Sequence, residues 1–375
     1  MKLIRITTIP LSLNKLLTGQ LKMLNEYYEV IAVSSPGKDL EEVSTREKVR
    51  VVEIPMERHI ALLKDMVSLL KLIRLFRKER PGIVHSLTPK AGLLSMLAAR
   101  ICRVPVRIHT FTGLIFPSAI GWKRKLLMMT DRITCSSATY INPEGVGVKH
   151  DLEENHITKK PLHIIANGNV NGIDLTYYNR IDEVMKAAIP YTDRKMFTFC
   201  FVGRMVHDKG INELVSAFDK LYKLHQDIRL ILVGPFEDTL DPISPKIKEL
   251  ILHHPNILFM GWQSDIRPFL AASDAFVFPS YREGFPNVLL QAGAMDLPCI
   301  VTDINGCNEI IVEGKNGTII PAKDEAKLYD TMQNWYEHRE KILTLSRNAR
   351  QMIAERYEQK QLWAALLDVY KSLEQ

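Results

Sequence analysis

Several features that define particular protein classes are missing from this chain of 375 residues. It has only five cysteines, none in a C-x-x-C pair, which argues against a disulfide scaffold or zinc site and favours reduced thiols. It has no run of 18 uncharged apolar residues, and charges interrupt its apolar start. The sequence therefore predicts neither a spanning helix nor a signal peptide. With 46% hydrophobic and 25% charged residues, we expect a globular, cytoplasmic protein.

The usual nucleotide-binding fingerprints are also missing. No G-x-G-x-x-G follows the first apolar segment, and no G-x-x-x-x-G-K-[ST] occurs anywhere. Because these glycine patterns cradle the phosphates in dehydrogenases and P-loop NTPases, the sequence argues against both classes.

Short apolar runs alternate with helical patterns along the whole chain, which is typical of βαβ units and parallel sheets. Strands are predicted in the first half at 3–7, 30–33, 49–54, 83–86, 106–110 and 162–166, and in the second half at 197–203, 228–234, 257–261, 275–280 and 299–303. Each half therefore predicts a doubly wound α/β domain. We place the first domain at 1–190, the second at 191–355, and a C-terminal helix that crosses back to the first domain at 356–375.

Charge is distributed unevenly between the two halves. Residues 1–190 carry 28 Lys and Arg against 18 Asp and Glu, whereas 191–375 carry 21 against 25. The basic surplus concentrates in 58–80 and 100–132, the latter with Trp122 beside three basic residues. Basic clusters next to apolar side chains suit an anionic membrane surface, although a merely solvated basic face would look the same. The apolar stripe at 62, 66, 69, 73 and 76 is expected to pack on the sheet.

The first motif whose residues could bind a ligand is FVGRMVHDKG, residues 201–210. A buried strand ends at Gly203, and Arg204 and Lys209 follow, five residues apart across a turn. Two cations so placed at the carboxyl end of a strand can converge on one diphosphate. A plain strand–helix connection with solvated charges is the alternative.

The second motif is PSYREGFPNVLLQAG, residues 279–293. Pro286 marks a helix start, whose N–H groups at Asn287 and Val288 would form a phosphate site. Glu283 precedes the helix, so its carboxylate can reach a hydroxylated ligand. Gln291 lies one turn beyond Asn287 and could contact the ligand's other end.

These motifs, together with TDINGCNEII at 302–311, resemble the retaining glycosyltransferases of family 4 over essentially the whole chain. The resemblance implies the GT-B fold, two facing Rossmann-like domains with a deep cleft between them. It implies that Arg204 and Lys209 bind the donor diphosphate and that Glu283, the first Glu of a Glu-x7-Glu motif, binds the transferred sugar. The remaining donor-binding positions that it implies are Gly203, Gly284, Phe285, Asn287, Val288, Gln291, Gly306 and Glu309.

Two positions depart from the family pattern. The second Glu of the motif is Gln291 here, and an amide can still hydrogen-bond a ribose diol, so altered ribose binding is expected. The family's T-x-H-G histidine is replaced by Thr112, with His109 three residues earlier; His109 is either a cleft residue or a structural histidine. Lys90, near a helix start, is a candidate anchor for an acceptor phosphate.

The resemblance implies a hexosyltransferase without a cofactor, active in surface-polysaccharide or glycan assembly. Since no Asp-x-Asp occurs, we also expect the donor diphosphate to bind without a metal. The enzyme's donor would be a nucleoside-diphosphate sugar, UDP rather than GDP, and its acceptor a lipid-linked saccharide at the inner face of the cell membrane. Three alternatives remain: a sugar-nucleotide epimerase, a phosphorylase of the same architecture, and a catalytically silent nucleotide-sugar-binding subunit. Nucleic-acid binding is disfavoured because no recognition motif accompanies the basic patches.

Overall fold

The computed structural model describes residues 1–57, 59, 61–239 and 241–374. The chain divides into two compact units, one formed by 1–171 with 360–375 and the other by 172–359. The boundary thus lies at 171 rather than at the expected 190. Residues 172–190 join the second unit because Ile173 pairs with Glu358 and helix α8 (Asp182–Ala188) packs on helix α11 (Arg267–Ala271).

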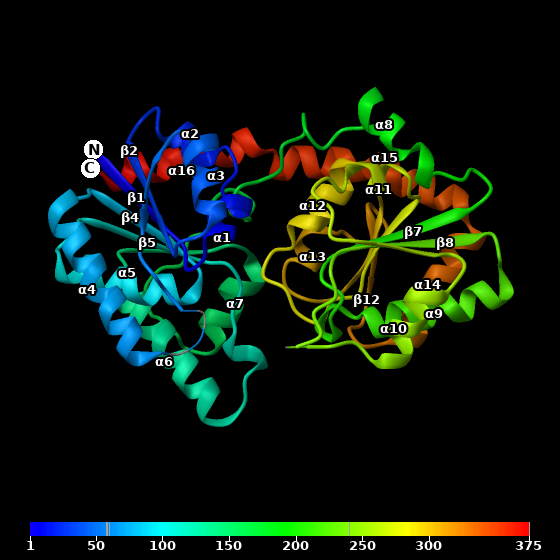
Figure 1. The fold of residues 1–375 in the computed structure, drawn as a ribbon, viewed down its shortest axis with the longest axis horizontal. Coiled ribbons are helices and arrows are strands. Elements are labelled where there is room, and N and C mark those ends of the chain that lie inside the picture. Colours follow the sequence, from blue (N-terminus) through cyan, green and yellow to red (C-terminus); the bar gives the residue numbers. More distant parts are fainter. Residues whose placement is uncertain (58, 60, 240, 375) are drawn as a thin grey trace. The chain divides into compact units, whose positions relative to one another are not determined.

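The first unit is built on a parallel six-stranded sheet (Figure 1). Its strands, in spatial order, are β3 (Arg50–Glu53), β2 (Glu29–Ser34), β1 (Lys2–Ile6), β4 (Ile83–Leu87), β5 (Val106–Phe111) and β6 (Tyr140–Pro143). Its helices are α1 (Pro10–Leu16), α2 (Gln20–Leu24), α3 (Lys38–Glu47), α4 (Leu62–Glu79), α5 (Pro89–Ile101), α6 (Gly121–Ser137), α7 (Val146–Glu154) and α16 (Gln359–Leu373), with a 3₁₀ turn at Phe116–Ser118.

Because side chains alternate between the two faces of the sheet, this unit has two apolar layers. In β1, Ile4 and Ile6 pack with α4, α5, α6 and α7, whereas Leu3 packs with α1, α2, α3 and α16. Successive side chains of a strand point to opposite faces, so Arg5 lies on the same face as Leu3, under α16. The returning helix α16 therefore completes one layer of the first unit.

The second unit has its own parallel six-stranded sheet and a single apolar core. Its strands, in spatial order, are β12 (Gly317–Ile320), β11 (Cys299–Thr302), β10 (Ala275–Phe278), β7 (Phe197–Val202), β8 (Ile228–Val233) and β9 (Ile257–Gly261). Besides α8 and α11, its helices are α9 (Ile211–Leu224), α10 (Pro245–His253), α12 (Asn287–Ala294), α13 (Cys307–Ile310), α14 (Glu325–Glu337) and α15 (Arg339–Tyr357), with 3₁₀ turns at Ile189–Tyr191 and His207–Lys209.

One predicted strand is wrong. The segment 162–166 forms no strand: Leu162 makes one isolated bridge to Ile141, and the chain then turns at Ala166, whose φ is +50°. The C-terminal helix predicted at 356–375 is confirmed as α16, but it begins at Gln359 because α15 extends to Tyr357. Within the residues that the structure describes, no helix is long and apolar enough to cross a membrane.

Candidate active site

The strand ends that carry the predicted motifs are neighbours in the second sheet. Strands β11, β10 and β7 lie side by side and run parallel. Because the carboxyl ends of parallel strands share one edge, the segments that follow them lie together. This edge gathers the turn 203–210 after β7, the loop 279–286 after β10 and the loop 303–306 after β11.

The turn after β7 is tightly built. Gly210 is the N-cap of helix α9 and has φ +69°, and a Cβ there would lie 2.1 Å from the Pro279 carbonyl oxygen. A side chain would therefore push the two loops apart. Arg204 leaves the end of β7, is 58% exposed, and forms an ion pair with Glu237. Glu237 follows β8, the next strand along the sheet.

Glu283 is held between a cation and a hydroxyl. Its Oε1 forms an ion pair with Lys209 Nζ and accepts a hydrogen bond from Ser280 Oγ at 2.7 Å. Ser280 is fully buried, and Lys209 also lies 5.1 Å from the centre of the Phe278 ring. The carboxylate is therefore fixed by two partners before any ligand arrives. Burial and the nearby Glu283 carboxylate hold the pKa of the Cys307 thiol well above its usual value.

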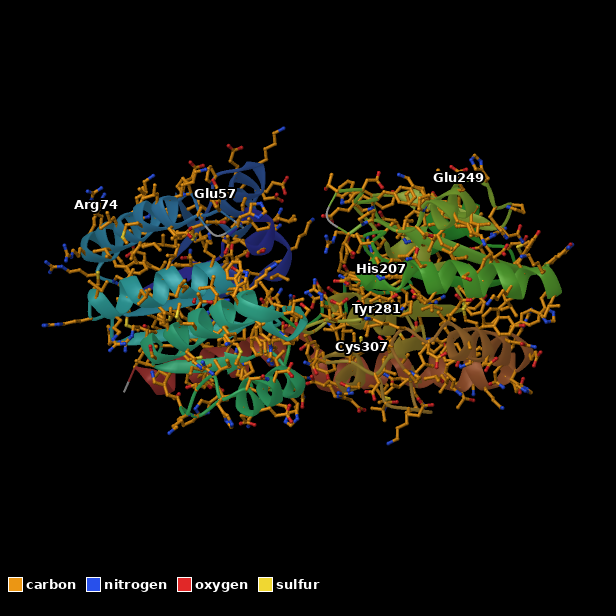
Figure 2. All side chains as sticks on the ribbon, turned by 90° about the horizontal axis from the view of Figure 1, so that it is seen from below. Glu57, Arg74, His207, Glu249, Tyr281 and Cys307 are labelled. Carbon is orange, nitrogen blue, oxygen red and sulfur yellow. The ribbon has the colours of Figure 1, made fainter. Side chains whose placement is uncertain are left out.

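Asp208 joins the first two loops. Its carbonyl oxygen accepts a hydrogen bond from Tyr281 N at 2.8 Å, and its carboxylate accepts one from Arg282 Nε at 2.7 Å. The Tyr281 ring stands edge-on to His207 at 5.2 Å, and its hydroxyl donates to Glu213 (Figure 2). The turn with Lys209 and the loop with Glu283 thus form one connected frame.

Helix α12 starts at Asn287, and Pro286 is its N-cap with φ −74° and ψ 104°. Pro286 thus lies one residue before the first helical position, next to the site predicted for it. The helix directs the N–H groups of its first turn and the positive end of its dipole to the shared edge. Val288 and Gln291 are half-buried on this helix, whereas Phe285 is buried edge-on against Tyr357 at 5.5 Å.

The loop after β11 touches the loop after β10. Gly306 has φ +74°, and a Cβ on it would lie 2.4 Å from the Gly284 carbonyl oxygen. Its amide donates to Glu309 Oε1 at 3.2 Å, so the Glu309 side chain caps helix α13. Gly203, Gly284 and Gly306 therefore lie where two backbones approach or turn.

The three acceptor-side candidates belong to the first unit. Lys90 Nζ forms an ion pair with Asp65 at 2.8 Å. His109 is buried, with Nδ1 2.9 Å from Ser86 Oγ, and burial lowers its pKa to about 3. Thr112 is half-buried just after β5. His109 thus lies in the interior as a neutral ring, and Lys90 already has a carboxylate partner.

Two residues of this frame escaped sequence reasoning. Ser280 supplies the hydroxyl on Glu283, and Glu237 supplies the carboxylate on Arg204. A hydroxyl three residues before Glu283, directly after a buried strand, was a usable signal for Ser280. Nothing in the sequence pairs Glu237 with Arg204, because 33 residues separate them. In the described part of the chain, no group of three His, Cys, Asp or Glu side chains is arranged to hold a metal ion.

Comparisons with known proteins identify the family. The model of group 1 glycosyl transferases matches residues 196–338, and that of the glycosyl transferase 4-like domain matches 22–168. The capsular polysaccharide biosynthesis glycosyltransferase CapM of Staphylococcus aureus is 31% identical over 373 residues, which cover 99% of this chain and 97% of CapM.

Two further proteins are similar. The UDP-Gal:alpha-D-GlcNAc-diphosphoundecaprenol alpha-1,3-galactosyltransferase of Escherichia coli is 31% identical over 74% of this chain and 72% of its own. Anabaena Alr3699/HepE, solved in complex with UDP, shares the fold with a TM-score of 0.81 and 15% identity, over 99% of this chain and 100% of its own. The chain therefore belongs to the group 1, 4-like glycosyltransferases and has the GT-B fold, as the resemblance predicted.

Proposed function

We propose that this chain moves a hexose, with retention at the anomeric carbon, from a nucleoside-diphosphate sugar to a lipid-linked saccharide in surface-polysaccharide assembly. UDP is the proposed nucleotide, and no metal or cofactor is required. The observation that carries the proposal is the meeting of Arg204, Lys209, Glu283 and the start of α12 at one sheet edge. The functions of the S. aureus and E. coli relatives and the UDP bound to HepE support the substrate classes.

The proposed donor chemistry follows from the charges at this edge. Both cations already form an ion pair with a carboxylate, Lys209 with Glu283 and Arg204 with Glu237. An ammonium has three donors and a guanidinium five, so each cation can hold a phosphate oxygen besides its carboxylate. With the positive end of the α12 dipole they stabilise the charge that develops on the leaving diphosphate. Glu283, held by Ser280, accepts hydrogen bonds from the hydroxyls of the transferred sugar.

The proposed transfer is a front-face substitution. The bond between the anomeric carbon and the diphosphate oxygen breaks, and the acceptor oxygen bonds to the same face of that carbon. The acceptor proton passes to the departing phosphate oxygen, so no enzyme nucleophile is needed. The role of the chain is to orient the donor and to stabilise the leaving group.

A transfer assay tests this proposal and separates it from its alternatives. Purified protein is incubated with UDP- and GDP-sugars and a polyprenyl-diphosphate-linked saccharide, with and without excess EDTA. We expect a longer saccharide with an α-linkage from an α-linked donor, formed from a UDP-sugar and unaffected by EDTA. Donor isomerisation without acceptor would instead indicate an epimerase, and nucleotide binding without turnover would indicate a silent subunit. A strict need for Mg²⁺ or Mn²⁺ would refute metal independence.

We further propose that the first unit attaches to the anionic inner face of the membrane. The apolar stripe expected to pack on the sheet does so only in part: Leu62 and Met66 are exposed, and Leu72 and Phe76 supply the buried face of α4. Most of the exposed apolar side chains of α4 lie in its first two turns, where Leu63 is 87% exposed. Lys71 and Arg74 lie exposed further along α4, and Arg74 points away from the unit (Figure 2).

A second exposed group lies at the start of α6. Trp122 is 74% exposed between Ile120, also exposed, and Lys123. Arg124 differs from its neighbours because it donates to Asn155 Oδ1 at 2.7 Å. Lys123 and Lys125 are therefore the charges that can be reversed without disturbing the unit.

The Lys123→Glu/Lys125→Glu variant is expected to bind anionic vesicles at least about 30-fold more weakly than wild type at low salt, because each of the two basic residues near such a surface contributes about 1 kcal/mol. Wild type should itself be released at high salt, since the Debye length falls from about 10 Å at 0.1 M to about 3 Å at 1 M. Co-sedimentation measures both. The matched control, Lys246→Glu/Lys315→Glu in the second unit, should sediment like wild type. Equal sedimentation of both variants would show that α6 is not the anchor.

A further inference from the structure

Arg5 is a buried cation without a carboxylate partner. It is the next-to-last residue of β1 and is 1% exposed. None of the ion pairs in the described part of the chain includes it. An isolated charge inside a protein is strongly unfavourable unless another charge or a full set of hydrogen bonds compensates for it.

The groups around Arg5 are neutral. Its Nη1 donates to the Tyr370 hydroxyl at 2.6 Å and lies 3.1 Å from His85 Nδ1. Burial raises the pKa of Tyr370, and burial together with the Arg5 charge lowers the pKa of His85 well below its usual value. Tyr370 is therefore a phenol and His85 an unprotonated imidazole, and neither offsets the charge of the guanidinium.

The remaining hydrogen bonds form a network that runs from Tyr370 to Asn142, and each donor in it has an acceptor. The Tyr370 hydroxyl donates to His85 Nδ1 at 2.6 Å, and His85 Nε2 donates to Thr110 Oγ1 at 2.7 Å. Thr110 donates to the Asn142 side-chain oxygen at 2.9 Å, and the Asn142 amide donates to the carbonyls of Pro143 and His163 at 3.1 and 2.8 Å. This network uses the hydrogen-bonding capacity of these side chains, but it supplies no negative charge to Arg5.

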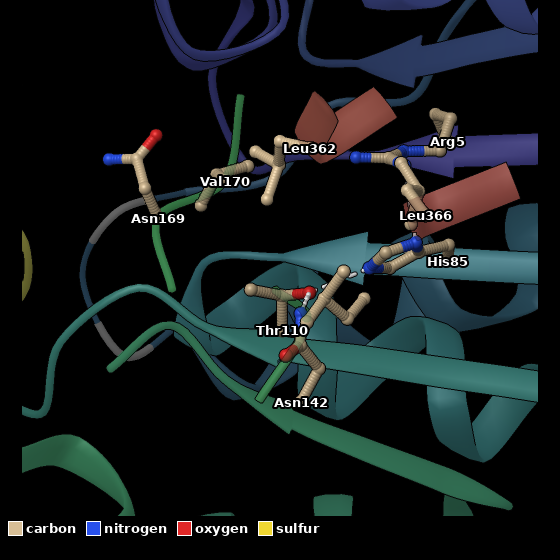
Figure 3. A pocket seen from close by; sticks show the side chains of 9 residues that line it. Arg5, His85, Thr110, Asn142, Asn169, Val170, Leu362 and Leu366 are labelled. Atoms are coloured by element: carbon tan, nitrogen blue, oxygen red, sulfur yellow. Dashed lines mark hydrogen bonds between the residues drawn. The ribbon is translucent and has the colours of Figure 1, made fainter. Parts of the chain in front are cut away.

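A small cavity of about 10 Å³ adjoins this cluster (Figure 3). Its lining includes Arg5, His85, Thr110 and Asn142 from four neighbouring strands, with Leu362 and Leu366 of α16 closing it. Arg5 Nε is buried and has no hydrogen-bond partner among the described residues. The cavity has room for about one water molecule, so a monatomic anion, which is somewhat larger, fits after a small displacement of the lining side chains. The cavity borders the side chain whose charge and N–H donor are both uncompensated.

We propose that this cavity is a binding site for a single monatomic anion of the halide class, chloride in the cell, held by the Arg5 guanidinium. A halide accepts the Nε hydrogen bond and neutralises the charge, whereas a water molecule would do only the first. A phosphate or carboxylate is too large for the space. Because Tyr370 lies on α16, the ion would also help to hold that helix on the first unit. The proposal does not depend on the proposed transferase activity.

Crystals of the whole chain soaked in sodium bromide provide the direct test. We expect an anomalous-difference peak, at the wavelength of the bromine absorption edge, within hydrogen-bonding distance of Arg5 Nε. A lighter peak with the density of water and no anomalous signal, in crystals that show bromide elsewhere, would overturn the proposal.

Thermal unfolding provides an independent measurement. At constant ionic strength, set with sodium gluconate, the melting temperature of wild type should rise by about 2 to 4 °C between 1 and 100 mM chloride. Arg5→Met should lose this response, since it removes the charge and leaves the Tyr370–His85 bond in place. Arg107→Met is the matched control: Arg107 is a partly buried arginine of the same unit that donates to the carbonyls of Ser137 and Val104, so its removal should leave the chloride response unchanged. Equal responses in wild type and Arg5→Met would contradict the proposal. If Arg5→Met does not fold, the bromide position decides alone.

Discussion

Replacing Glu283 with alanine is expected to lower kcat/KM for transfer by about 10²- to 10³-fold. The carboxylate is held by Lys209 and Ser280 at the edge where the sugar is proposed to lie, so its loss removes a charged acceptor that is already oriented. Lys209 loses its partner as well, which lowers the free energy of unfolding by about 1–2 kcal/mol. Initial rates and a denaturation curve, measured together, separate the two effects.

Two further variants sharpen this experiment. Glu283→Gln keeps an acceptor oxygen and loses the charge, so its rate should fall between those of wild type and Glu283→Ala. Glu340→Ala removes a carboxylate that is 71% exposed on α15 and should leave the rate unchanged. Near-wild-type turnover by Glu283→Ala would show that this edge does not bind the transferred sugar.

Gly306→Ala is expected to lose at least about 10²-fold in activity, because a shift of about 1 Å in a catalytic group has an effect of this size. The new Cβ would meet the Gly284 carbonyl oxygen at 2.4 Å and the Phe285 Cα at 2.9 Å. Both are backbone atoms, so the whole loop that carries Glu283 must move. The rise in KM for the donor should exceed the fall in kcat, since the loop is proposed to bind the donor.

Gly314→Ala is the matched control for this substitution. Gly314 has a similar φ, +69°, but no atom lies within 4 Å of the position that a Cβ would take. Its alanine variant meets only the left-handed backbone strain of about 1–2 kcal/mol and should remain active. Steady-state kinetics and melting curves of Gly306→Ala and Gly314→Ala separate the effect of the contact between loops from the effect of the backbone strain. Equal activity of the two variants would mean that contact between the loops is not needed for transfer.

The inner strands of both sheets and the edge strands β3 and β9 could be predicted from the sequence, whereas the other two edge strands could not. Both strands that were missed, β6 and β12, are edge strands of four residues. An edge strand is covered on fewer sides, so it lacks the continuous apolar run that marks a buried parallel strand. Pro143 ends β6 and is tolerated there because an edge strand need not donate every N–H. The segment 162–166 was predicted to be a strand because it is apolar. Its Ile165 is indeed buried, but the segment does not join the hydrogen-bonded sheet.

The places of the proposed donor-binding residues could be predicted because short loops carry them directly after buried strands. The positions of Arg204, Lys209 and Glu283 follow once β7 and β10 are recognised as neighbours. Of their partners, Ser280 had a usable signal, a hydroxyl three residues before Glu283. Glu237 could not be predicted, because 33 residues separate it from Arg204. The exposure of the apolar residues at the start of α4 could not be predicted from the sequence either. An apolar stripe does not show which of its members the neighbouring elements cover.

The return of α16 to the first unit bears on the order in which the chain can fold during synthesis. Leu362, Leu366 and Tyr370 belong to the apolar layer on one face of the first sheet, yet the ribosome makes them only after the whole second unit. The second unit is continuous, 172–359, so it can complete its core while the first still exposes part of a layer. The contact between Arg5 and Tyr370, 365 residues apart, is thus among the last to form. The first unit, although translated first, finishes folding second.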